Sequence, residues 1–207
     1  MDIALFRDKL AYQGVSLGIV ALAATAALVA ANISTRGPIE QAEARDLQAS
    51  LAQVLPEGTA DNDMLKDVVD ITDGDGTKKT VYRARKAGAI TGAVFQTAAR
   101  GYAGDVVVLI GVDPHGVLMG ARVIKHQETP GLGDKIEAAK SNWIHDFEGK
   151  SLDNPLPEKW LVKKDGGVFD QFAGATITPR AVVKAVKGGL DFYQAHRKEI
   201  VEGEVPR

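Results

Sequence analysis

Asp170–Pro179, with the sequence DQFAGATITP, leads directly into a helix-like pattern. Apolar residues recur there at three- and four-residue spacing with polar residues between them: Val183, Val186, Leu190 and Tyr193. Thr178 is therefore expected to cap a C-terminal helix, and Pro179 to occupy its first position, where a missing N–H costs nothing. A hydroxyl at a helix N-terminus faces unpaired backbone donors and the positive end of the helix dipole, as phosphate sites do. Small residues at Gly174 and Ala175 would let a bulky group approach the backbone.

The rest of the C-terminal part alternates between apolar segments and turns. A helix is expected over residues 133–147 and a short strand over 160–162. Four longer segments predict strands: 80–86, 89–98, 105–112 and 117–126. Together these elements predict an α+β domain with a mainly antiparallel sheet and flanking helices.

The acidic stretch Asp73-Gly74-Asp75-Gly76 has two interpretations. A calcium loop of the EF-hand type needs glycine at its sixth position and glutamate at its twelfth, where this chain has Lys78 and Ala84. A hairpin turn is therefore the better prediction.

The N-terminal part contains an uncharged stretch, Gly14–Ile33. A helix of about 20 apolar residues crosses the ~30 Å hydrocarbon core of a membrane. A cleaved signal peptide is the alternative, because Val29-Ala30-Ala31 offers small residues suited to cleavage. The apolar stretch exceeds the usual signal core of about 7–15 residues, so an uncleaved transmembrane helix is favoured.

The helix is expected to break at Arg36-Gly37-Pro38, and a second, amphipathic helix to run from Ile39 to Val54. Basic residues are nearly balanced on the two sides of the span, and the N-terminal amine favours a cytoplasmic N-terminus. The predicted organisation has four parts: a cytoplasmic N-terminus over 1–13, a transmembrane helix over 14–33, a linker helix over 34–60 and an extracytoplasmic domain over 61–207.

Composition excludes several classes of function. The hydrophobic share of 45% and the charged share of 25% are typical of a globular chain. A net charge of −2 gives no electrostatic reason to expect nucleic acid. Cysteine is absent, which excludes disulfides, iron–sulfur ligation and thiolate zinc sites in this chain. The four histidines share no ligand spacing, and no Ser/His/Asp set can be argued, so neither a metal site nor a catalytic residue is predicted.

A second candidate site is HQETPGLG, residues 126–133. Its Pro-Gly pair predicts a tight turn, and Gly131 and Gly133 leave backbone N–H groups uncovered near the expected start of a helix. Taken alone, this stretch is explained by a turn between strand and helix.

Residues 170–178 resemble the flavinylation motif of the FMN-binding domain family, found in the G subunit of the Rnf electron-transport complex and in the C subunit of the Na+-translocating NADH:quinone reductase. In that family a flavin transferase joins FMN, through its phosphate, to the hydroxyl of the last threonine of the motif. The resemblance makes Thr178 the acceptor, in preference to Thr176. The family usually has Ser or Thr where this chain has Ala173.

The second candidate site is also similar to a family signature, the Glu-Thr-Pro-Gly-Leu-Gly loop that lines the flavin in the Rnf G subunit. It implies that Glu128 and Thr129 offer side-chain contacts, and that Leu132 and Gly133 lie against the ring system. Gly101-Tyr102 matches a further family position, although a tyrosine at a sheet edge needs no flavin to explain it. The predicted cofactor-binding set has nine members: Thr178, Thr176, Ala175, Gly174, Glu128, Thr129, Leu132, Gly133 and Tyr102.

The resemblance extends over essentially the whole chain and favours the Rnf G subunit over the quinone reductase C subunit, because the chain is compact and carries Gly-Leu-Gly-Asp-Lys after the proline. It implies an electron carrier with one covalent FMN, single-pass in a bacterial inner membrane with its C-terminal domain in the periplasm. The implied complex couples NADH/ferredoxin electron transfer to Na+ or H+ translocation. The implied partners are an NADH-binding flavoprotein, an iron–sulfur protein and multi-span membrane proteins of the complex, with a flavin transferase for maturation.

A different class of function is also consistent with the residues. In a non-redox, membrane-anchored interaction module, Thr178 would serve only as a helix cap. That interpretation predicts a colourless protein.

Overall fold

The computed structural model describes residues 10–74 and 76–202. The chain divides between Asp46 and Leu47 into an N-terminal helical unit and a larger C-terminal unit, which carries the sheet. The predicted boundaries at residues 34 and 61 coincide with neither this division nor the end of the first helix, and they stay predictions.

The first helix, α2, runs without interruption from Leu10 to Gln53. Its segment Tyr12–Thr35 is 24 residues long with a mean hydropathy of 2.2, which is long and apolar enough to cross a membrane. This segment contains the predicted span. A signal sequence near an N-terminus meets the same criterion, so the transmembrane role stays a prediction.

The predicted helix break at Arg36-Gly37-Pro38 is wrong, since Pro38 lies inside α2. A proline in a helix interior removes one backbone hydrogen bond and crowds the carbonyl four residues earlier, at a cost of about 3 kcal/mol. Its fixed φ is nevertheless a helical value, so the helix continues through it.

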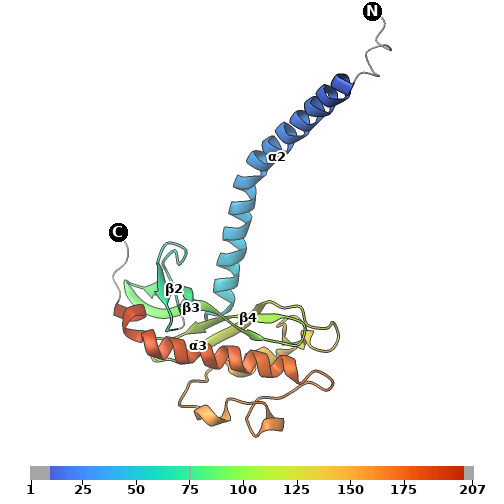
Figure 1. Ribbon diagram of the computed structural model, residues 1–207. Helices are drawn as coiled ribbons and strands as arrows, with labels where there is room; N and C mark the ends of the chain where they lie inside the picture. The colour runs from blue at the N-terminus through green and yellow to red at the C-terminus, as the bar shows by residue number, and fades with distance from the viewer. Residues whose placement is uncertain (1–9, 75, 203–207) are drawn as a thin grey trace, which may run out of the picture. The chain divides into compact units, whose positions relative to one another are not determined.

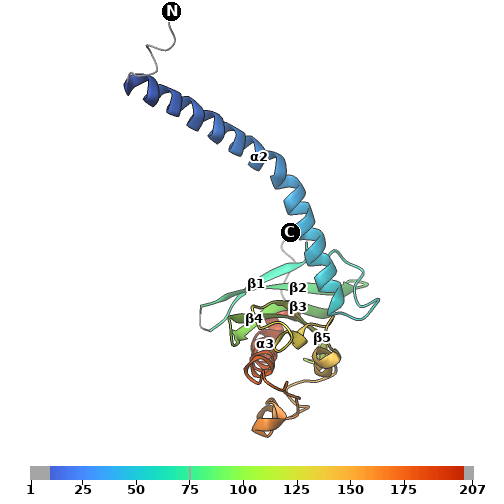
Figure 2. The ribbon, with the colours of Figure 1, turned by 90° about the vertical axis from the view of Figure 1, so that its right-hand side faces the viewer.

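The C-terminal unit is built on a five-stranded antiparallel sheet in which each strand pairs with the next along the chain (Figure 2). The strands are β1 Val68–Thr72, β2 Lys78–Lys86, β3 Ala89–Arg100, β4 Asp105–Val112 and β5 Leu118–Lys125. Four of them agree with the predicted segments to within two residues at each end, and β1 was not predicted. The hairpin turn predicted at Asp73–Gly76 is confirmed, because the Asp73 N–H donates to the Thr77 carbonyl (2.9 Å) between the paired strands β1 and β2. Asp75 itself lies outside the described residues.

Between β5 and the last helix the chain differs from prediction. The expected helix over 133–147 is instead two 3-10 helices, η1 Asp134–Ile136 and η2 Asn142–Phe147. Ser141 separates them, since its hydroxyl binds both the Lys135 carbonyl (2.6 Å) and the Trp143 N–H (3.2 Å). A serine side chain that binds the backbone in this way competes with helical hydrogen bonds.

The expected strand over 160–162 is also wrong, because it is reduced to one bridge between Val162 and Phe169. Two further 3-10 helices, η3 Pro157–Lys159 and η4 Lys163–Asp165, stand on either side and leave no room for a longer pairing.

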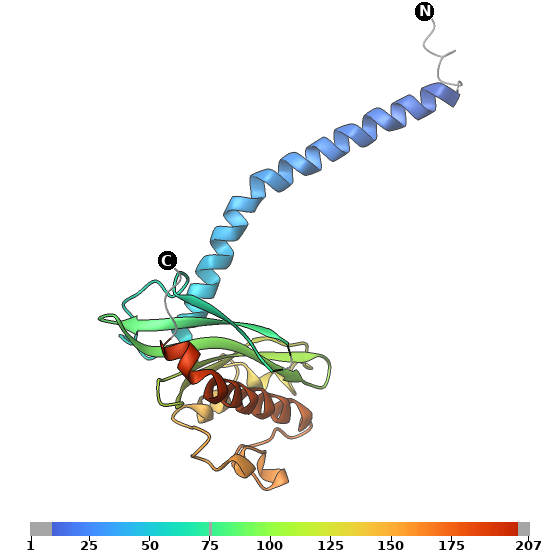
Figure 3. The same cartoon turned by 60° about the vertical axis from the view of Figure 1, so that its left-hand side comes forward.

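The last helix, α3, runs from Ile177 to Glu202 and lies along one face of the sheet over β3 and β4 (Figures 1 and 3). The predicted apolar stripe is buried against that face: Val183, Val186, Leu190 and Tyr193. Strand residues alternate between the two faces, so Phe95 and Ile110 join the core beneath α3, whereas Val94 and Leu109 point the other way.

The opposite face of the sheet is covered by the chain at the end of α2. Leu51 and Val54 pack there against Val94 and Leu109. A Cβ added at Gly120 would lie 2.8 Å from the Val54 carbonyl oxygen, so the glycine permits this close approach. Both faces of the sheet are thus covered, and the site lies at one end of α3.

Candidate functional site

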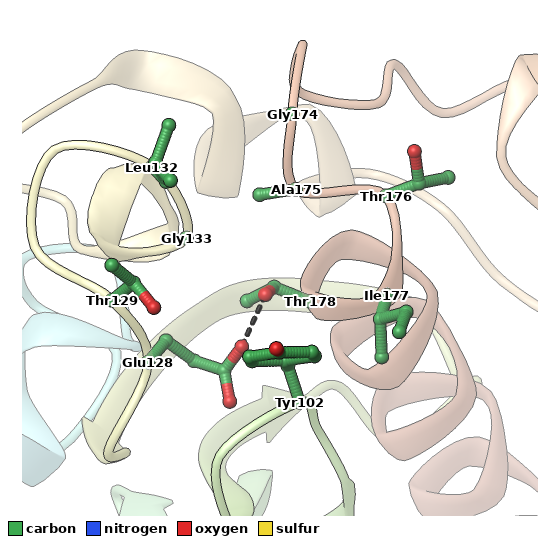
Figure 4. A pocket seen from close by; sticks show the side chains of 10 residues that line it. All are labelled: Tyr102, Glu128, Thr129, Leu132, Gly133, Gly174, Ala175, Thr176, Ile177 and Thr178. Atoms are coloured by element: carbon green, nitrogen blue, oxygen red, sulfur yellow. Dashed lines mark hydrogen bonds between the residues drawn. The ribbon is translucent and has the colours of Figure 1, made fainter.

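All nine residues of the predicted cofactor-binding set line one pocket at the start of α3 (Figure 4). The pocket has a volume of about 380 Å³, within the range of sites for small molecules and cofactors. Ile177 is its tenth lining residue and was not predicted, although it stands between the two threonines of the motif. The lining comes from three segments far apart in sequence: the β3–β4 turn, the chain after β5 and the chain leading into α3.

The floor of the pocket is a buried hydroxyl–carboxylate pair. Thr178 is 1% exposed and Glu128 is 4% exposed. The Thr178 hydroxyl donates a hydrogen bond to Oε2 of Glu128 (Figure 4). The other carboxylate oxygen, Oε1, accepts the Ala103 N–H at 3.1 Å from the β3–β4 turn. Each carboxylate oxygen therefore has a partner, and the side chain is aimed at the hydroxyl.

This pairing corrects the prediction that Thr178 caps the helix. Helix α3 begins one residue earlier, at Ile177, and the Arg180 N–H donates to the Thr176 carbonyl at 3.5 Å. Thr178 is thus the second helical residue, and its hydroxyl points to Glu128 rather than to the backbone. In the first turn of α3, Ile177 and Thr178 keep backbone N–H groups for an anion, since Pro179 has none and the Arg180 N–H is paired.

Two glycines leave the space in which the Thr178 hydroxyl and the Glu128 carboxylate meet. A Cβ at Gly133 would lie 2.8 Å from the Thr178 hydroxyl oxygen and 3.0 Å from the Glu128 Cβ. A Cβ at Gly101 would lie 2.6 Å from Oε1 of Glu128. Side chains at these positions would occupy the space that the hydroxyl–carboxylate pair needs.

The rim of the pocket is apolar and open to solvent. Tyr102 is 68% exposed, Leu132 45% and Ile177 46%. Large exposed apolar side chains around a concave site are suited to contact with a ring system. The Thr176 side chain points away from Glu128 (Figure 4), so the two threonines of the motif differ in their surroundings.

We define the Thr178 loop as residues 169–178. The Ala175 N–H donates to the Phe172 carbonyl at 3.2 Å and closes a turn. Gly174, the third residue of that turn, has a φ of 82°, a left-handed conformation that favours glycine. Glycine is therefore required for the bend that brings the chain into α3.

Aromatic side chains hold the Thr178 loop in place. Trp143 donates its indole N–H to the Asp170 carbonyl at 2.9 Å and meets Phe172 edge to face, with ring centroids 5.2 Å apart. Phe169 stacks on Phe147 at 4.4 Å, and Trp160 packs beside both rings. Aromatic packing therefore supports this loop, beside the exposed ion pair between Lys163 and Asp170 at 2.7 Å.

An ion pair ties the start of α3 to η4. Arg180 binds both carboxylate oxygens of Asp165, at 2.6 and 2.7 Å. The Arg180 guanidinium lowers the pKa of Asp165 below its usual value, and the carboxylate raises the pKa of Arg180.

We define the Glu128 loop as residues 126–140, and polar contacts hold it. The Glu128 N–H donates to Nδ1 of His126 at 3.1 Å. Since Nδ1 accepts, Nε2 carries the ring proton and donates it to Oε1 of Glu137 at 2.9 Å. The neutral imidazole therefore suffices for both bonds. Sequence reasoning did not assign His126 this supporting role.

Lys140 completes the network in the Glu128 loop. Its ammonium binds Asp134 at 2.9 Å and Glu137 at 2.7 Å. The bond from Lys140 lowers the pKa of both carboxyl groups, helped by the Gly131 N–H at Asp134, and the two carboxylates raise the pKa of Lys140.

Within residues 10–74 and 76–202, His, Cys, Asp and Glu form no group of three or more able to hold a metal ion. The pocket itself offers a hydroxyl, a carboxylate, a helix N-terminus and an apolar rim.

The chain matches a family of domains over the region of the pocket and individual proteins over most of its length. Residues 101–191 match the FMN-binding domain family, and this range includes every residue that lines the pocket. The G subunit of the ion-translocating oxidoreductase complex of Cereibacter sphaeroides is 48% identical over 195 residues, which cover 94% of this chain and 89% of that protein. The G subunit of the same complex in Stutzerimonas stutzeri is 47% identical, over 90% of this chain and 82% of that protein.

The crystal structure of Shewanella oneidensis NqrC resembles the fold with a TM-score of 0.50. It is 22% identical in sequence and covers 68% of this chain and 74% of that one. At this identity the likeness supports the α+β fold alone. The identity of 47–48% to the G subunits agrees with the prediction from the motifs, which favoured the Rnf G subunit over the quinone reductase C subunit.

Proposed function

The chain belongs to the family of G subunits of ion-translocating oxidoreductase complexes, and on this premise we propose that it is an electron carrier with one FMN esterified, through its phosphate, to Thr178. The observation that carries the proposal is the pocket at the start of α3. All nine residues of the predicted cofactor-binding set line this pocket, and Thr178 lies on its floor.

The residues present fit a flavin phosphate ester. The Thr178 hydroxyl is the attachment point, and the backbone N–H groups of Ile177 and Thr178 at the start of α3 would receive the phosphate charge. Gly133 keeps the space beside the hydroxyl free of a side chain. Tyr102, Leu132 and Ile177 would contact the ring system at the exposed rim.

When bound, FMN supplies one- and two-electron chemistry, and the protein provides its position and polarity. An exposed rim leaves one edge of the ring system accessible to a redox partner. The relatives that this chain matches over most of its length are named as subunits of an ion-translocating oxidoreductase complex. The proposed role is therefore that of a carrier.

Mass spectrometry of the peptide that contains Thr178 tests the attachment. The full chain is produced with the flavin transferase, and we expect the mass of one FMN ester on this peptide. Thr178→Ala removes the ester and Thr178→Ser keeps it, while Thr176→Ala is the matched control and remains modified. Modification that persists in Thr178→Ala but disappears in Thr176→Ala would contradict the assignment.

A colour measurement separates this proposal from a non-redox interaction module. A covalent flavin gives a visible spectrum that survives denaturation and precipitation of the protein. An interaction module predicts a colourless protein, and it also predicts that Thr178→Ala leaves electron flow intact. The Thr178 hydroxyl points to Glu128 and not to the helix backbone, which removes the support for a capping role.

We further propose that the chain works in a membrane complex that couples NADH/ferredoxin electron transfer to Na+ or H+ translocation. The proposed partners are an NADH-binding flavoprotein, an iron–sulfur protein and multi-span membrane proteins. Segment Tyr12–Thr35 would anchor the chain as a single-pass protein of a bacterial inner membrane, with the C-terminal domain in the periplasm. No charged side chain lies between Gly14 and Ile33, so ion movement would depend on the other members of the complex.

Purification from native membranes tests the assembly. We expect the chain to elute with several other proteins of the complex, and membranes that lack it to lose ferredoxin–NAD electron transfer. A chain that purifies only as a free monomer, and whose deletion leaves that activity whole, would contradict the role in a complex even if the flavin is present.

A further inference from the structure

We propose that Glu128 is the catalytic base for esterification of Thr178, so that the protein contributes one of the groups needed for its own flavinylation. The proposal rests on the assignment of Thr178 as the acceptor. It gives Glu128 a role before the flavin is attached, beyond a contact to the bound cofactor.

The geometry of the pocket floor points to this role. The Thr178 hydroxyl donates its hydrogen bond to Oε2 of Glu128, so the proton already lies on the path to the carboxylate. Both groups are buried, so water does not compete for the hydroxyl proton. The Ala103 N–H holds the other carboxylate oxygen and fixes its orientation.

The surroundings of Glu128 bring no cation to the carboxylate. Lys140 of the Glu128 loop is engaged with Asp134 and Glu137, and no ion pair joins a cation to Glu128 within the part of the chain that the structure describes. The first contacts of the Glu128 carboxylate are one backbone N–H and the Thr178 hydroxyl. It is therefore free of an ion-pair partner among the described residues and is able to accept a proton.

The reaction needs an activated phosphoryl donor, and a flavin dinucleotide provides one in its phosphoanhydride. Oγ1 of Thr178 forms a bond to the phosphorus next to riboflavin, and the bond from that phosphorus to the AMP oxygen breaks. The hydroxyl proton passes to Oε2 of Glu128, and AMP leaves with the electron pair. No atom is oxidised or reduced in this exchange.

The same contact explains the choice between the two threonines of the motif. Only Thr178 donates to Glu128, whereas the Thr176 side chain points away from the carboxylate (Figure 4). A hydroxyl beside a positioned base is the better nucleophile, and general-base assistance typically contributes about 10²–10⁴-fold in rate.

Initial rates of flavinylation test the base. The full chain, purified in detergent without flavin, is mixed with flavin transferase and flavin dinucleotide, and the ester is quantified by mass spectrometry. We expect Glu128→Gln to slow the reaction by about 100-fold or more, because the amide keeps the shape but accepts no proton. Glu148→Gln, a half-exposed carboxylate at the end of η2, is the matched control and should stay within about threefold of wild type.

A pH series distinguishes a base from a merely structural residue. The ratio of the wild-type rate to the Glu128→Gln rate should fall as the pH is lowered, because protonation removes the base from the wild type. A Glu128→Gln chain that folds and reacts within about threefold of wild type overturns the proposal. If Glu128→Gln fails to fold, the flavinylation rate of Glu128→Ala is measured with and without formate, which replaces the missing carboxylate. A rate restored by formate supports the base, and a rate that formate leaves unchanged overturns the proposal.

The outcome also separates this proposal from the assignment of the acceptor. Wild-type protein that is never modified at Thr178 contradicts the acceptor and the base together. Wild-type and Glu128→Gln proteins modified at Thr178 at equal rates contradict the base alone.

Discussion

The Thr178 loop and the Glu128 loop meet at the floor of the same pocket, but different forces hold them. The Thr178 loop is fixed by stacked and edge-to-face aromatic rings. The Glu128 loop is fixed by an imidazole, two carboxylates and an ammonium. Apolar packing is insensitive to pH, whereas a network of ionised groups is not. The Thr178 hydroxyl thus stands on the side of the pocket that aromatic rings support, and the Glu128 carboxylate on the side whose supporting groups titrate in acid.

The largest expected effect on stability comes from the aromatic rings that support the Thr178 loop. Phe147→Ala should lower the free energy of unfolding by about 3–5 kcal/mol, because it removes a fully buried ring and leaves a cavity beneath Phe169. Urea denaturation followed by Trp fluorescence measures the loss. A loss below about 1 kcal/mol would show that packing does not hold the Thr178 loop.

The next effect is expected where the two loops touch. Gly133 has a φ of −85°, so alanine fits the backbone there and only the added Cβ matters. Gly133→Ala should cost about 1–3 kcal/mol by overpacking the floor, and should reduce flavin loading because the Cβ crowds the Thr178 hydroxyl. Both are measured on the same preparation, by denaturation and by mass spectrometry.

Gly188→Ala is the matched control for that substitution. Gly188 lies within α3, and no atom stands within 4 Å of an added Cβ. Alanine there should raise stability by about 0.5–1 kcal/mol through its helix propensity. Equal losses at the two positions would contradict the role of Gly133 in the floor.

A smaller effect is expected in the pH dependence of stability, from the ionised groups of the Glu128 loop. The folded-state pKa values of Asp134 and Glu137 are lowered, chiefly by Lys140. Their contribution is therefore complete above their unfolded values of about 4 and is lost as the pH falls through the lowered folded values. Lys140→Met should flatten this acid dependence. Urea midpoints from about pH 6, on the plateau, down to about pH 2, below the unfolded values, measure the slope for both proteins.

The smallest effect is expected at the Asp165–Arg180 pair, which is partly exposed. Arg180→Gln should lower stability only slightly, and the difference from wild type should vanish in high salt, which screens exposed charges. Thermal unfolding at low and high salt measures it. A large loss that persists in high salt would mean that the start of α3 depends on this pair.

Local patterns predicted much of the fold and of the site. Strands β2 to β5 were predicted because strand-like segments rich in apolar residues are separated by turns, and α3 because Val183 to Tyr193 repeat at helical spacing. Short-range geometry also explains Gly174, whose turn needs a positive φ. Motif resemblance supplied the nine pocket residues, since each of them falls within a short matched stretch.

Other features depend on contacts that no local pattern carries. β1 forms because it pairs with β2 in register, although residues 68–72 stand in an acidic, turn-rich stretch. The helix expected over 133–147 gives way to two 3-10 helices because Ser141 binds the backbone on both sides. α2 continues through Pro38, where the local rule predicts a break.

The sequence by itself therefore determined which residues gather at the pocket and which hydroxyl stands at the start of α3. Only the tertiary structure decided that this hydroxyl donates to Glu128, a residue 50 positions away, instead of capping its own helix. The physical reason is that capping depends on neighbours within one turn. A buried hydroxyl beside a buried carboxylate forms the stronger, charge-assisted bond, and folding alone brings those two groups together.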